Sequence, residues 1–232
     1  MKQYEGMTNE RLGEITARFS KLRVAVIGDF FLDKYLDVDQ SIAETSVETG
    51  KTANQVVSVR HSPGAAGTVV LNLSALGTGT LYAVGYTGDD GQSYDIRKDL
   101  DALRCSTEYM EMSRQRMTPT YVKPRFIHDK SLAGENNRYD IKNRSRTPEA
   151  LEAKILTSVD ALIGRVDAFI IADQVQEDDF GVVTKKVREA IGAQAKRNPK
   201  VVFLADSRTH IRLYRNVMIK PNQFEDVGHD AP

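Results

Sequence analysis

Carboxylate and amide side chains follow several of the short apolar runs in this sequence. Asp29 and Asp33 come at and just after the end of the run LRVAVIGDF, and Asp173 closes the run VDAFIIAD. Because the carboxyl ends of parallel strands meet at one edge of a sheet, polar groups in these places would gather there. The sequence therefore predicts a polar site at that edge. The positions at predicted strand ends are Asp29, Asp33, residues 85–88, Asp173, Asp206 and Asn222.

Asn222 and Glu225 stand at N-x-x-E spacing directly after the short apolar run 217–219. This arrangement suits a polar site at a strand-to-helix turn. It equally suits a helix start, with Asn222 as the cap and Glu225 in the first turn, where the helix dipole favours a negative charge. The residues alone leave both interpretations open.

The elements that would position these side chains alternate between strand and helix. Apolar runs of strand length are separated by stretches with helical spacing, such as Leu151, Ile155, Val159 and Leu162 after Pro148. This order predicts an α/β fold, a doubly wound parallel sheet flanked by helices. One helix is expected from a cap at Thr8 or Asn9, and another over residues 179–197.

Two regions differ in composition from the rest of the chain. In residues of about 34–62 and 119–141, polar residues dominate and alternate in places with apolar ones, which is typical of exposed strands. We expect two strands joined by a long loop in the first region, and a hairpin loop near 129–134 in the second. Both would lie outside the main core, as β-rich insertions of a single domain covering residues 1–232.

Composition bounds the class of protein. The 232 residues carry 32 basic and 32 acidic side chains, so no net field would draw the chain to nucleic acid or to an anionic membrane. A single cysteine, Cys105, excludes an internal disulfide and fits a reducing compartment. No apolar run approaches the roughly 20 residues that span a bilayer. We expect a soluble, cytoplasmic protein.

Several common site motifs are absent from the sequence. There is no G-x-x-x-x-G-K-[ST], no G-x-G-x-x-G after a strand and no G-x-S-x-G. The four histidines lack metal-ligand spacing, and one cysteine cannot anchor a zinc site. These absences argue against P-loop enzymes, dinucleotide-binding folds, α/β-hydrolases and zinc proteins.

Four segments, in order, resemble the ribokinase/PfkB-type carbohydrate kinase family, and most closely its branch of heptose-phosphate kinases. They are VIGDFFLDKYLD; the glycine-rich PGAAGTVVLNLSALG; TPTYVKPRFI with NNRYDIKNR; and IKPNQFE, which is similar to the family's P-N-x-x-E element. The resemblance runs from about residue 22 to residue 225. It implies a ribokinase-like fold, with the two β-rich insertions forming a small lid over a sugar. Lids of this kind have exposed strand edges that can pair between subunits, so the resemblance also implies a homodimer through the lid.

The resemblance implies roles for residues on the sugar side of the site. Asp33 would accept hydrogen bonds from sugar hydroxyls, where the alternative is a turn-forming aspartate. The glycine-rich turn would bring the backbone close to the sugar at a helix start, the alternative being a plain helix entry. Asp173 would contact the substrate or lid, or else cap a helix. The implied substrate-binding residues are Asp33, Gly64, Ala65, Gly67, Thr68, Asp173 and Arg138.

Arg138 belongs to a locally basic stretch with Lys142, Arg144 and Arg146. One interpretation is a solvated rim. The other is that these cations indicate a phosphorylated sugar as the substrate.

The resemblance places ATP and Mg²⁺ at the other end of the site. Asn222 would face the nucleotide phosphates, and Glu225 would hold Mg²⁺ through its waters, because a transferring phosphoryl group needs its charge offset. The reaction would move the γ-phosphoryl group of ATP to a sugar or sugar-phosphate hydroxyl.

The sequence departs from the family pattern in two ways. Ala65 stands where a second glycine is usual, and Thr68 where an asparagine is usual, which leaves the identity of the sugar open. The family's G-A-G-D element, whose aspartate is the general base, does not occur in the 232 residues. No catalytic residue is therefore assigned. We expect a C-terminally incomplete chain with little phosphoryl transfer of its own. The alternatives are an inactive relative that binds a sugar or a partner, and a nucleoside kinase.

Overall fold

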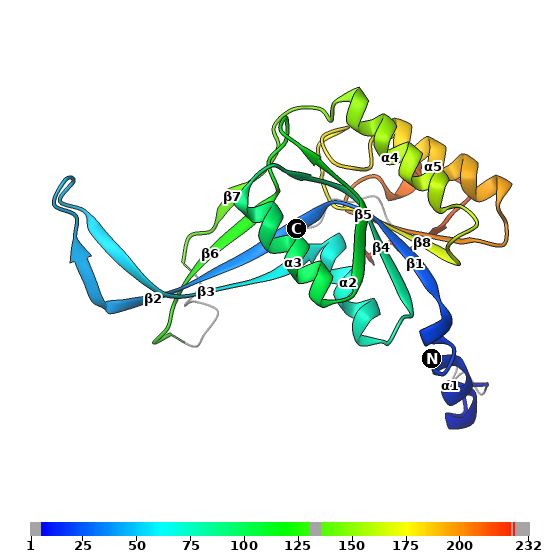
Figure 1. The fold of residues 1–232 in the computed structure, drawn as a ribbon, viewed down its shortest axis with the longest axis horizontal. Helices are drawn as coiled ribbons and strands as arrows, with labels where there is room; N and C mark the ends of the chain where they lie inside the picture. Colours follow the sequence, from blue (N-terminus) through cyan, green and yellow to red (C-terminus); the bar gives the residue numbers. More distant parts are fainter. Residues whose placement is uncertain (1–5, 130–135, 224, 226–232) are drawn as a thin grey trace.

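A computed structural model describes residues 6–129, 136–223 and 225. The main sheet has six parallel strands in the order β10-β9-β8-β1-β4-β5, and a second sheet has four strands in the order β3-β2-β6-β7 (Figure 1). The α-helices are α1 (Asn9–Thr16), α2 (Ala66–Ala75), α3 (Gly91–Ala102), α4 (Glu149–Leu162) and α5 (Lys185–Arg197), with 3-10 turns η1 (Phe19–Lys21) and η3 (Ile211–Leu213). The strands are β1 (Arg23–Gly28), β2 (Phe30–Thr45), β3 (Thr52–Ala65), β4 (Thr80–Gly88), β5 (Cys105–Ser113), β6 (Thr120–Phe126), β7 (Tyr139–Ile141), β8 (Ala168–Asp173), β9 (Val202–Ser207) and β10 (Met218–Ile219).

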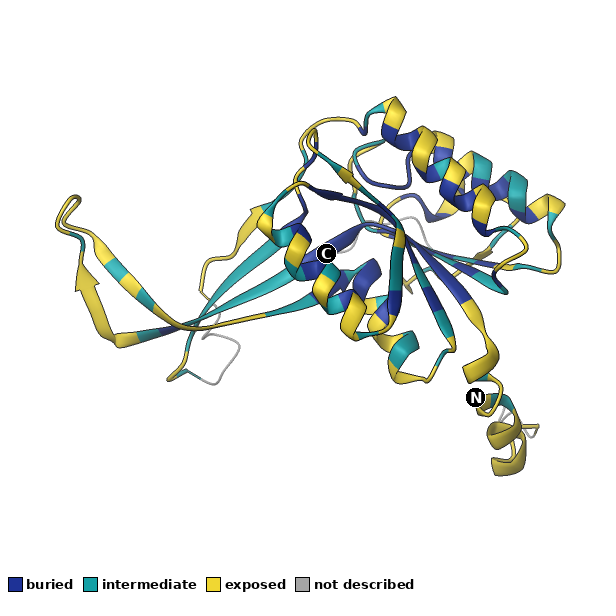
Figure 2. Cartoon of the chain, viewed as in Figure 1, coloured by how far each residue is buried: buried dark blue, intermediate teal, exposed yellow. Residues whose placement is uncertain are grey.

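The main sheet is buried on both faces, which explains why its strands are apolar throughout. Successive residues of β1 point to opposite faces: Ala25 and Ile27 join the core under α4 and α5, while Val24 and Val26 join the core under α2 and α3. Figure 2 shows this central layer as buried and the outer faces of the helices as exposed. The predicted doubly wound α/β fold is confirmed.

The second sheet is built on two long strands. Strands β2 and β3 pair antiparallel from Phe30 opposite Ala65 out to Thr45 opposite Thr52, so a short turn joins them and the expected long loop is wrong. Strand β6 runs parallel to β2, and β7 closes the sheet against β6. The far ends of β2 and β3 project away from the helices as an arm (Figure 1). The expected hairpin loop near 129–134 lies almost wholly outside the described residues.

Three local expectations differ from the structure for physical reasons. Strand β5 was missed because its alternating sequence, CSTEYMEMS, matches an edge strand rather than a buried one. Helix α5 begins at Lys185 instead of residue 179, since the Thr184 side chain caps it and accepts a hydrogen bond from the N–H of Val187. Pro148 lies one residue before α4 rather than inside its first turn. The Thr8 cap of α1 is confirmed.

None of the described helices is long and apolar enough to cross a bilayer.

Candidate active site

A cavity of about 400 Å³ opens where the carboxyl ends of β1 and β8 face the second sheet. The predicted polar edge therefore does border a cavity, and two of the expected strand-end carboxylates, Asp29 and Asp33, line it. The other lining residues are Phe31, Ala65, Tyr86, Pro119, Tyr121, Lys123, Arg138, Lys142, Asn143, Gln174, Val175, Gln176, Glu177, Phe180 and Arg208.

Asp33 faces this cavity from β2 and pairs with Lys123 of β6. The Lys123 Nζ lies 2.6 Å from the buried Oδ1 of Asp33, in a geometry that leaves this oxygen without a well-directed hydrogen bond. Burial alone would lower the pKa of Lys123, but contact with Asp33 and Tyr35 outweighs burial and raises it. Lys123 therefore keeps its positive charge beside Asp33, and lone pairs of the Asp33 carboxylate can still accept hydrogen bonds from hydroxyl groups.

Tyr121 forms an aromatic wall beside this pair. Its ring packs against Phe31 at 5.1 Å between centroids, and the guanidinium carbon of Arg138 lies 4.3 Å from its centroid. The Lys142 Nζ lies 5.7 Å from the same ring. Arg138 and Lys142 also lie 2.6 Å and 3.8 Å from Asp140. The far side of the cavity therefore carries cations that lie close to Asp140, and the near side holds the ion pair of Asp33 with Lys123.

Asp29 organises the segment that forms a third wall. Its carboxylate accepts hydrogen bonds from the backbone N–H groups of Gln174 (2.9 Å), Val175 (3.2 Å) and Val182 (2.7 Å). Complete burial, and next the charge of Asp173, raise the pKa of Asp29 to about 6, against the opposing effect of these three donors. Asp29 is thus a structural anion beneath the cavity as well as one of its lining groups.

Arg116, almost fully buried, ties the same segment to β4. Its Nη2 donates to the carbonyl of Phe180 at 2.6 Å and to the hydroxyl of Tyr86 at 3.1 Å. Its Nη1 donates to the carbonyl of Ser145 at 2.9 Å. Phe180 and Tyr86 both line the cavity, so Arg116 fixes one of its walls from behind.

The glycine-rich turn lies at the end of β3, against Asp33. Ala65, with a φ of +53°, immediately precedes α2 and lines the cavity. A Cβ on Gly64 would lie 2.5 Å from Asp33 Oδ2, and one on Gly67 would lie 2.4 Å from the Pro63 Cβ. Thr68 is exposed, and its hydroxyl donates to the Pro63 carbonyl at 3.4 Å. Within the glycine-rich turn, Ala65 lines the cavity and Gly64, Gly67 and Thr68 do not. The absence of a side chain at Gly64 leaves space for the Asp33 carboxylate.

Replacing Gly64 with alanine is expected to weaken ligand binding in this cavity by roughly tenfold, because the new methyl group displaces the Asp33 carboxylate by several tenths of an ångström. Isothermal titration calorimetry measures the effect. Gly91→Ala, where a Cβ meets nothing within 4 Å, is the matched control. Equal affinities for the two variants would show that Asp33 does not depend on the space at Gly64.

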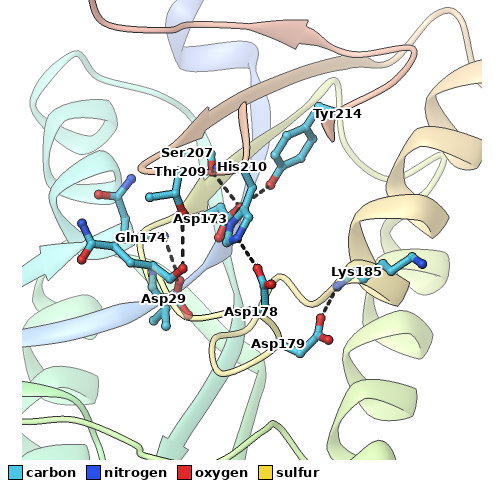
Figure 3. Close-up of polar contacts among 12 residues, drawn as sticks. Asp29, Asp173, Gln174, Asp178, Asp179, Lys185, Ser207, Thr209, His210 and Tyr214 are labelled. Atoms are coloured by element: carbon cyan, nitrogen blue, oxygen red, sulfur yellow. Dashed lines mark hydrogen bonds and ion pairs between the residues drawn. The ribbon is translucent and has the colours of Figure 1, made fainter. Parts of the chain in front are cut away.

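Asp173 is placed beside the cavity and does not line it. Its Oδ2 accepts hydrogen bonds from the Ser207 hydroxyl (2.8 Å) and the Tyr214 hydroxyl (3.2 Å), and lies 3.4 Å from His210 Nδ1 (Figure 3). The carboxylate therefore joins β8, β9 and η3 from within. The substrate role that the sequence suggested for Asp173 stays a prediction.

Asn222 and Glu225 form a reciprocal capping box. The Asn222 Oδ1 accepts from the Glu225 N–H at 2.9 Å, and the Glu225 carboxylate accepts from the Asn222 N–H and Nδ2, each at 2.8 Å. Neither residue lines the cavity. The geometry has the form of the helix-start interpretation and leaves the nucleotide role as a prediction. Within the described part of the chain, no cluster of three metal-ligand side chains occurs.

Sequence reasoning missed Lys123, Tyr121 and Arg208 as cavity residues. Tyr121 and Lys123 are two positions apart in a strand, so they share a face, and this much could be read from the sequence. Which face meets Asp33 depends on the parallel register of β2 and β6, which pairs Asp33 with Tyr121.

The chain was compared with family models, curated proteins and solved structures. No family model matches it. The bifunctional protein HldE of Pseudomonas syringae pv. syringae is 30% identical over 220 residues, covering 91% of this chain and 42% of that protein. HldE of Aliarcobacter butzleri is 26% identical over 211 residues, covering 88% and 41%. A putative phosphofructokinase from Staphylococcus aureus shares the fold, with a TM-score of 0.56 and 12% identity over 79% of this chain and 53% of that one.

The chain has the predicted ribokinase-like fold, which that phosphofructokinase shares, and its sequence is similar to HldE over 91% of its length.

A second structure of this fold is the phosphofructokinase-2 of Escherichia coli in complex with fructose-6-phosphate, with a TM-score of 0.52 and 14% identity over 80% of this chain and 55% of that one. The chain spans about two-fifths of the length of the HldE proteins it matches.

Proposed function

We propose that this chain forms the acceptor side of a carbohydrate kinase, which transfers the γ-phosphoryl group of ATP to a hydroxyl of a sugar phosphate. The observation that carries the proposal is the polarity of the cavity. Asp33 offers hydrogen-bond acceptors at one side, and Arg138, Lys142 and Arg208 lie around Tyr121 and the 174–177 segment at the other. Hydroxyl groups suit the first side and a phosphate group the second.

The lining residues would act mainly by positioning. Asp33 would fix the sugar through two hydroxyls, with Lys123 paired to its carboxylate. Tyr121 and Phe31 would cover one face of the ring, and Asp29 would hold the 174–182 segment in place around it. In phosphoryl transfer, positioning of this kind supplies much of the rate.

A calorimetric comparison of a sugar with its own phosphate ester tests this proposal. We expect a heptose 7-phosphate or hexose 6-phosphate to bind at least about tenfold more tightly than the free sugar, with an affinity that falls as salt is added. A nucleoside that binds better than either would favour the nucleoside-kinase alternative. Equal binding of sugar and ester would contradict the proposed phosphate group.

ATP and Mg²⁺ are the cofactors that we propose. Each Glu225 oxygen accepts one described hydrogen bond, from Asn222, and a carboxylate oxygen can accept another from a metal-bound water. The residues therefore fit a hydrated Mg²⁺, which would offset charge on the transferring phosphoryl group. Asn222 would lie close to the same phosphates.

Replacing Glu225 with glutamine is expected to reduce Mg²⁺-dependent nucleotide binding about tenfold while changing stability by less than about 1 kcal/mol, because glutamine can still close the capping box. Titration with ATP in the presence and absence of Mg²⁺ measures the first effect, and urea unfolding the second. A loss of stability with nucleotide binding unchanged would leave Glu225 as a cap alone.

Transfer by residues 1–232 alone is a separate question, because the sequence contains no G-A-G-D. We propose that these residues bind the acceptor but turn over slowly, and a sugar- or partner-binding role without catalysis is the alternative. A coupled assay of ADP release decides between them. Turnover well above background that Asp33→Ala abolishes would contradict slow transfer.

A homodimer through the second sheet completes the proposal. Strand β3 lies at the edge of that sheet, and its side chains Val56, Val57 and Val59 are 44%, 52% and 52% exposed. An exposed edge with apolar side chains favours pairing with a second copy. We expect sedimentation to show a dimer that Val57→Glu with Val59→Glu dissociates. A wild-type monomer at micromolar concentration would contradict this part of the proposal.

A further inference from the structure

Arg188, in the first turns of α5, is a buried arginine without an anionic partner. It is 9% exposed, and its guanidinium carbon lies 5.8 Å from the centroid of the Tyr214 ring. Across the described residues, its side chain makes no hydrogen bond and no ion pair. Arg116, the other arginine buried to this degree, donates to the carbonyls of Ser145 and Phe180.

A guanidinium group keeps its charge in proteins, so its burial is costly unless acceptors surround it. The carbonyl groups around Arg116 accept hydrogen bonds from both of its Nη atoms, and its buried Nε has no partner in the described residues. For Arg188 the ring of Tyr214 offers only a cation–π contact, which satisfies none of the five N–H donors. None of the Arg188 nitrogen atoms is among the buried, unpartnered atoms of the described residues, so its donors reach the water of a cavity and are available to a ligand.

Arg188 borders a second cavity of about 400 Å³, between residues 178–179, the first turns of α5 and η3. The two least exposed groups in its lining are Arg188 and His210, whereas the Asp178 and Glu189 side chains are 83% and 68% exposed. The Asp179 side chain, which also lines the cavity, is 28% exposed. The innermost groups of the cavity are therefore two cationic side chains, and carboxylates lie further out. The lining is Arg146, Asp178, Asp179, Lys185, Arg188, Glu189, His210 and Leu213.

His210 adds to the positive charge of the inner end. Its Nε2 lies 2.8 Å from Asp178 Oδ1, and its Nδ1 lies 3.4 Å from Asp173 Oδ2 (Figure 3). A ring with a carboxylate near each nitrogen favours the doubly protonated form. Asp173 is the main cause of a raised pKa of His210; burial and the charge of Arg188 oppose it, and Asp178 adds to it.

The start of α5 also favours an anion in this cavity. Lys185 and Arg188 both belong to its first turns, where the helix dipole favours a negative charge. The Lys185 N–H already donates to Asp179 Oδ1 at 2.7 Å, as Figure 3 shows. The helix therefore attracts an anion through its dipole and not through the Lys185 N–H. The donors come from the side chains.

From these observations we propose that the second cavity is a binding site for a phosphate group, held chiefly by the donors of Arg188, with His210 adding positive charge beside it. The ligand class is a phosphate dianion, either free or as a small monoester, since its several oxygens match the N–H groups of a guanidinium. The site is additional to the sugar cavity, because the two cavities share no lining residue. Residues 174–177 and Phe180 line the first, and Asp178 and Asp179, between them in sequence, line the second.

Isothermal titration of the full chain with inorganic phosphate tests the proposal, with glycerol 3-phosphate as the monoester and sodium chloride as the monovalent control. We expect saturable binding of phosphate at millimolar concentration or tighter, lost at least tenfold in Arg188→Met. Arg197→Met, on the exposed end of the same helix, should leave binding unchanged. Tighter binding of the monoester than of phosphate would identify an organic ligand, and the reverse order would identify the free ion.

Two further variants keep the test decisive if Arg188→Met does not fold. Asp178→Asn removes an exposed carboxylate that competes for His210, so it should tighten phosphate binding severalfold. Arg138→Met removes a cation from the first cavity only and should leave the phosphate binding that depends on Arg188 unchanged. Absence of phosphate binding in the wild type, unchanged binding in both Arg188→Met and Asp178→Asn, or loss of binding in Arg138→Met would overturn the proposal. The last result would place the phosphate in the sugar cavity and would still agree with the proposed kinase function.

Discussion

Replacing Asp33 with alanine is expected to weaken sugar-phosphate binding by at least about 100-fold. Two hydrogen bonds from sugar hydroxyls to an ionised carboxylate contribute about 3 kcal/mol together, and each 1.4 kcal/mol corresponds to tenfold in affinity. The variant also leaves Lys123, 2.6 Å from Asp33 in the wild type, without its carboxylate partner at the cavity wall. Isothermal titration calorimetry with the tightest-binding sugar phosphate measures the loss.

Asp37 provides a control on the same strand. It lies four residues further along β2 and pairs with Arg60 at 2.7 Å, outside the cavity lining. Asp37→Asn should therefore bind the ligand as the wild type does. If Asp33→Ala and Asp37→Asn bind equally well, the carboxylate of Asp33 has no part in recognition, and the proposed acceptor site is wrong.

The fold was predictable because burial leaves a direct trace in the sequence. Strands covered on both faces, such as β1 and β8, are continuous apolar runs, and the helices between them have apolar residues at helical spacing. Strand β5 has only one neighbour in the sheet and alternates in burial, so this trace is missing. The extent of β2 and β3 was also hidden, because polar arms far from a core carry no apolar pattern.

The candidate site was predictable where a residue belongs to a pattern visible in the sequence. Asp29 closes an apolar run, whereas Asp33, Ala65 and Arg138 belong to segments that resemble the carbohydrate kinases, and all four line the cavity. Lys123 was not assigned, since its position depends on the pairing of β2 with β6, which are distant in sequence. The role of Asp29 was hidden for another reason: its three partners are backbone N–H groups, which are the same for every residue type.

Replacing Asp29 with alanine is expected to lower the free energy of unfolding by about 3 kcal/mol or more. The change leaves three backbone N–H groups of Gln174, Val175 and Val182 without their acceptor, at about 1–3 kcal/mol for each buried donor. Urea unfolding measures the loss, and hydrogen exchange should show faster exchange at residues 174–182. Asp167→Ala is the control, because this exposed carboxylate accepts three hydrogen bonds from Arg23 at the opposite end of the sheet. Losses of equal size would mean that burial of Asp29 adds nothing.

Asp29 also predicts a dependence of stability on pH. Its pKa of about 6 in the folded chain lies above the 3.8 of an exposed aspartate, so the folded state holds more protons between these values. The contribution of Asp29 to the free energy of unfolding therefore increases by about 1.4 kcal/mol as pH falls from 7.5 to 5.0. The same stabilisation disappears as pH rises through 6. Asp29→Asn cannot titrate, so the wild type should gain that amount relative to the variant over this range. Parallel stability curves for the two proteins would show that Asp29 is ionised throughout, with the three N–H groups outweighing burial and Asp173.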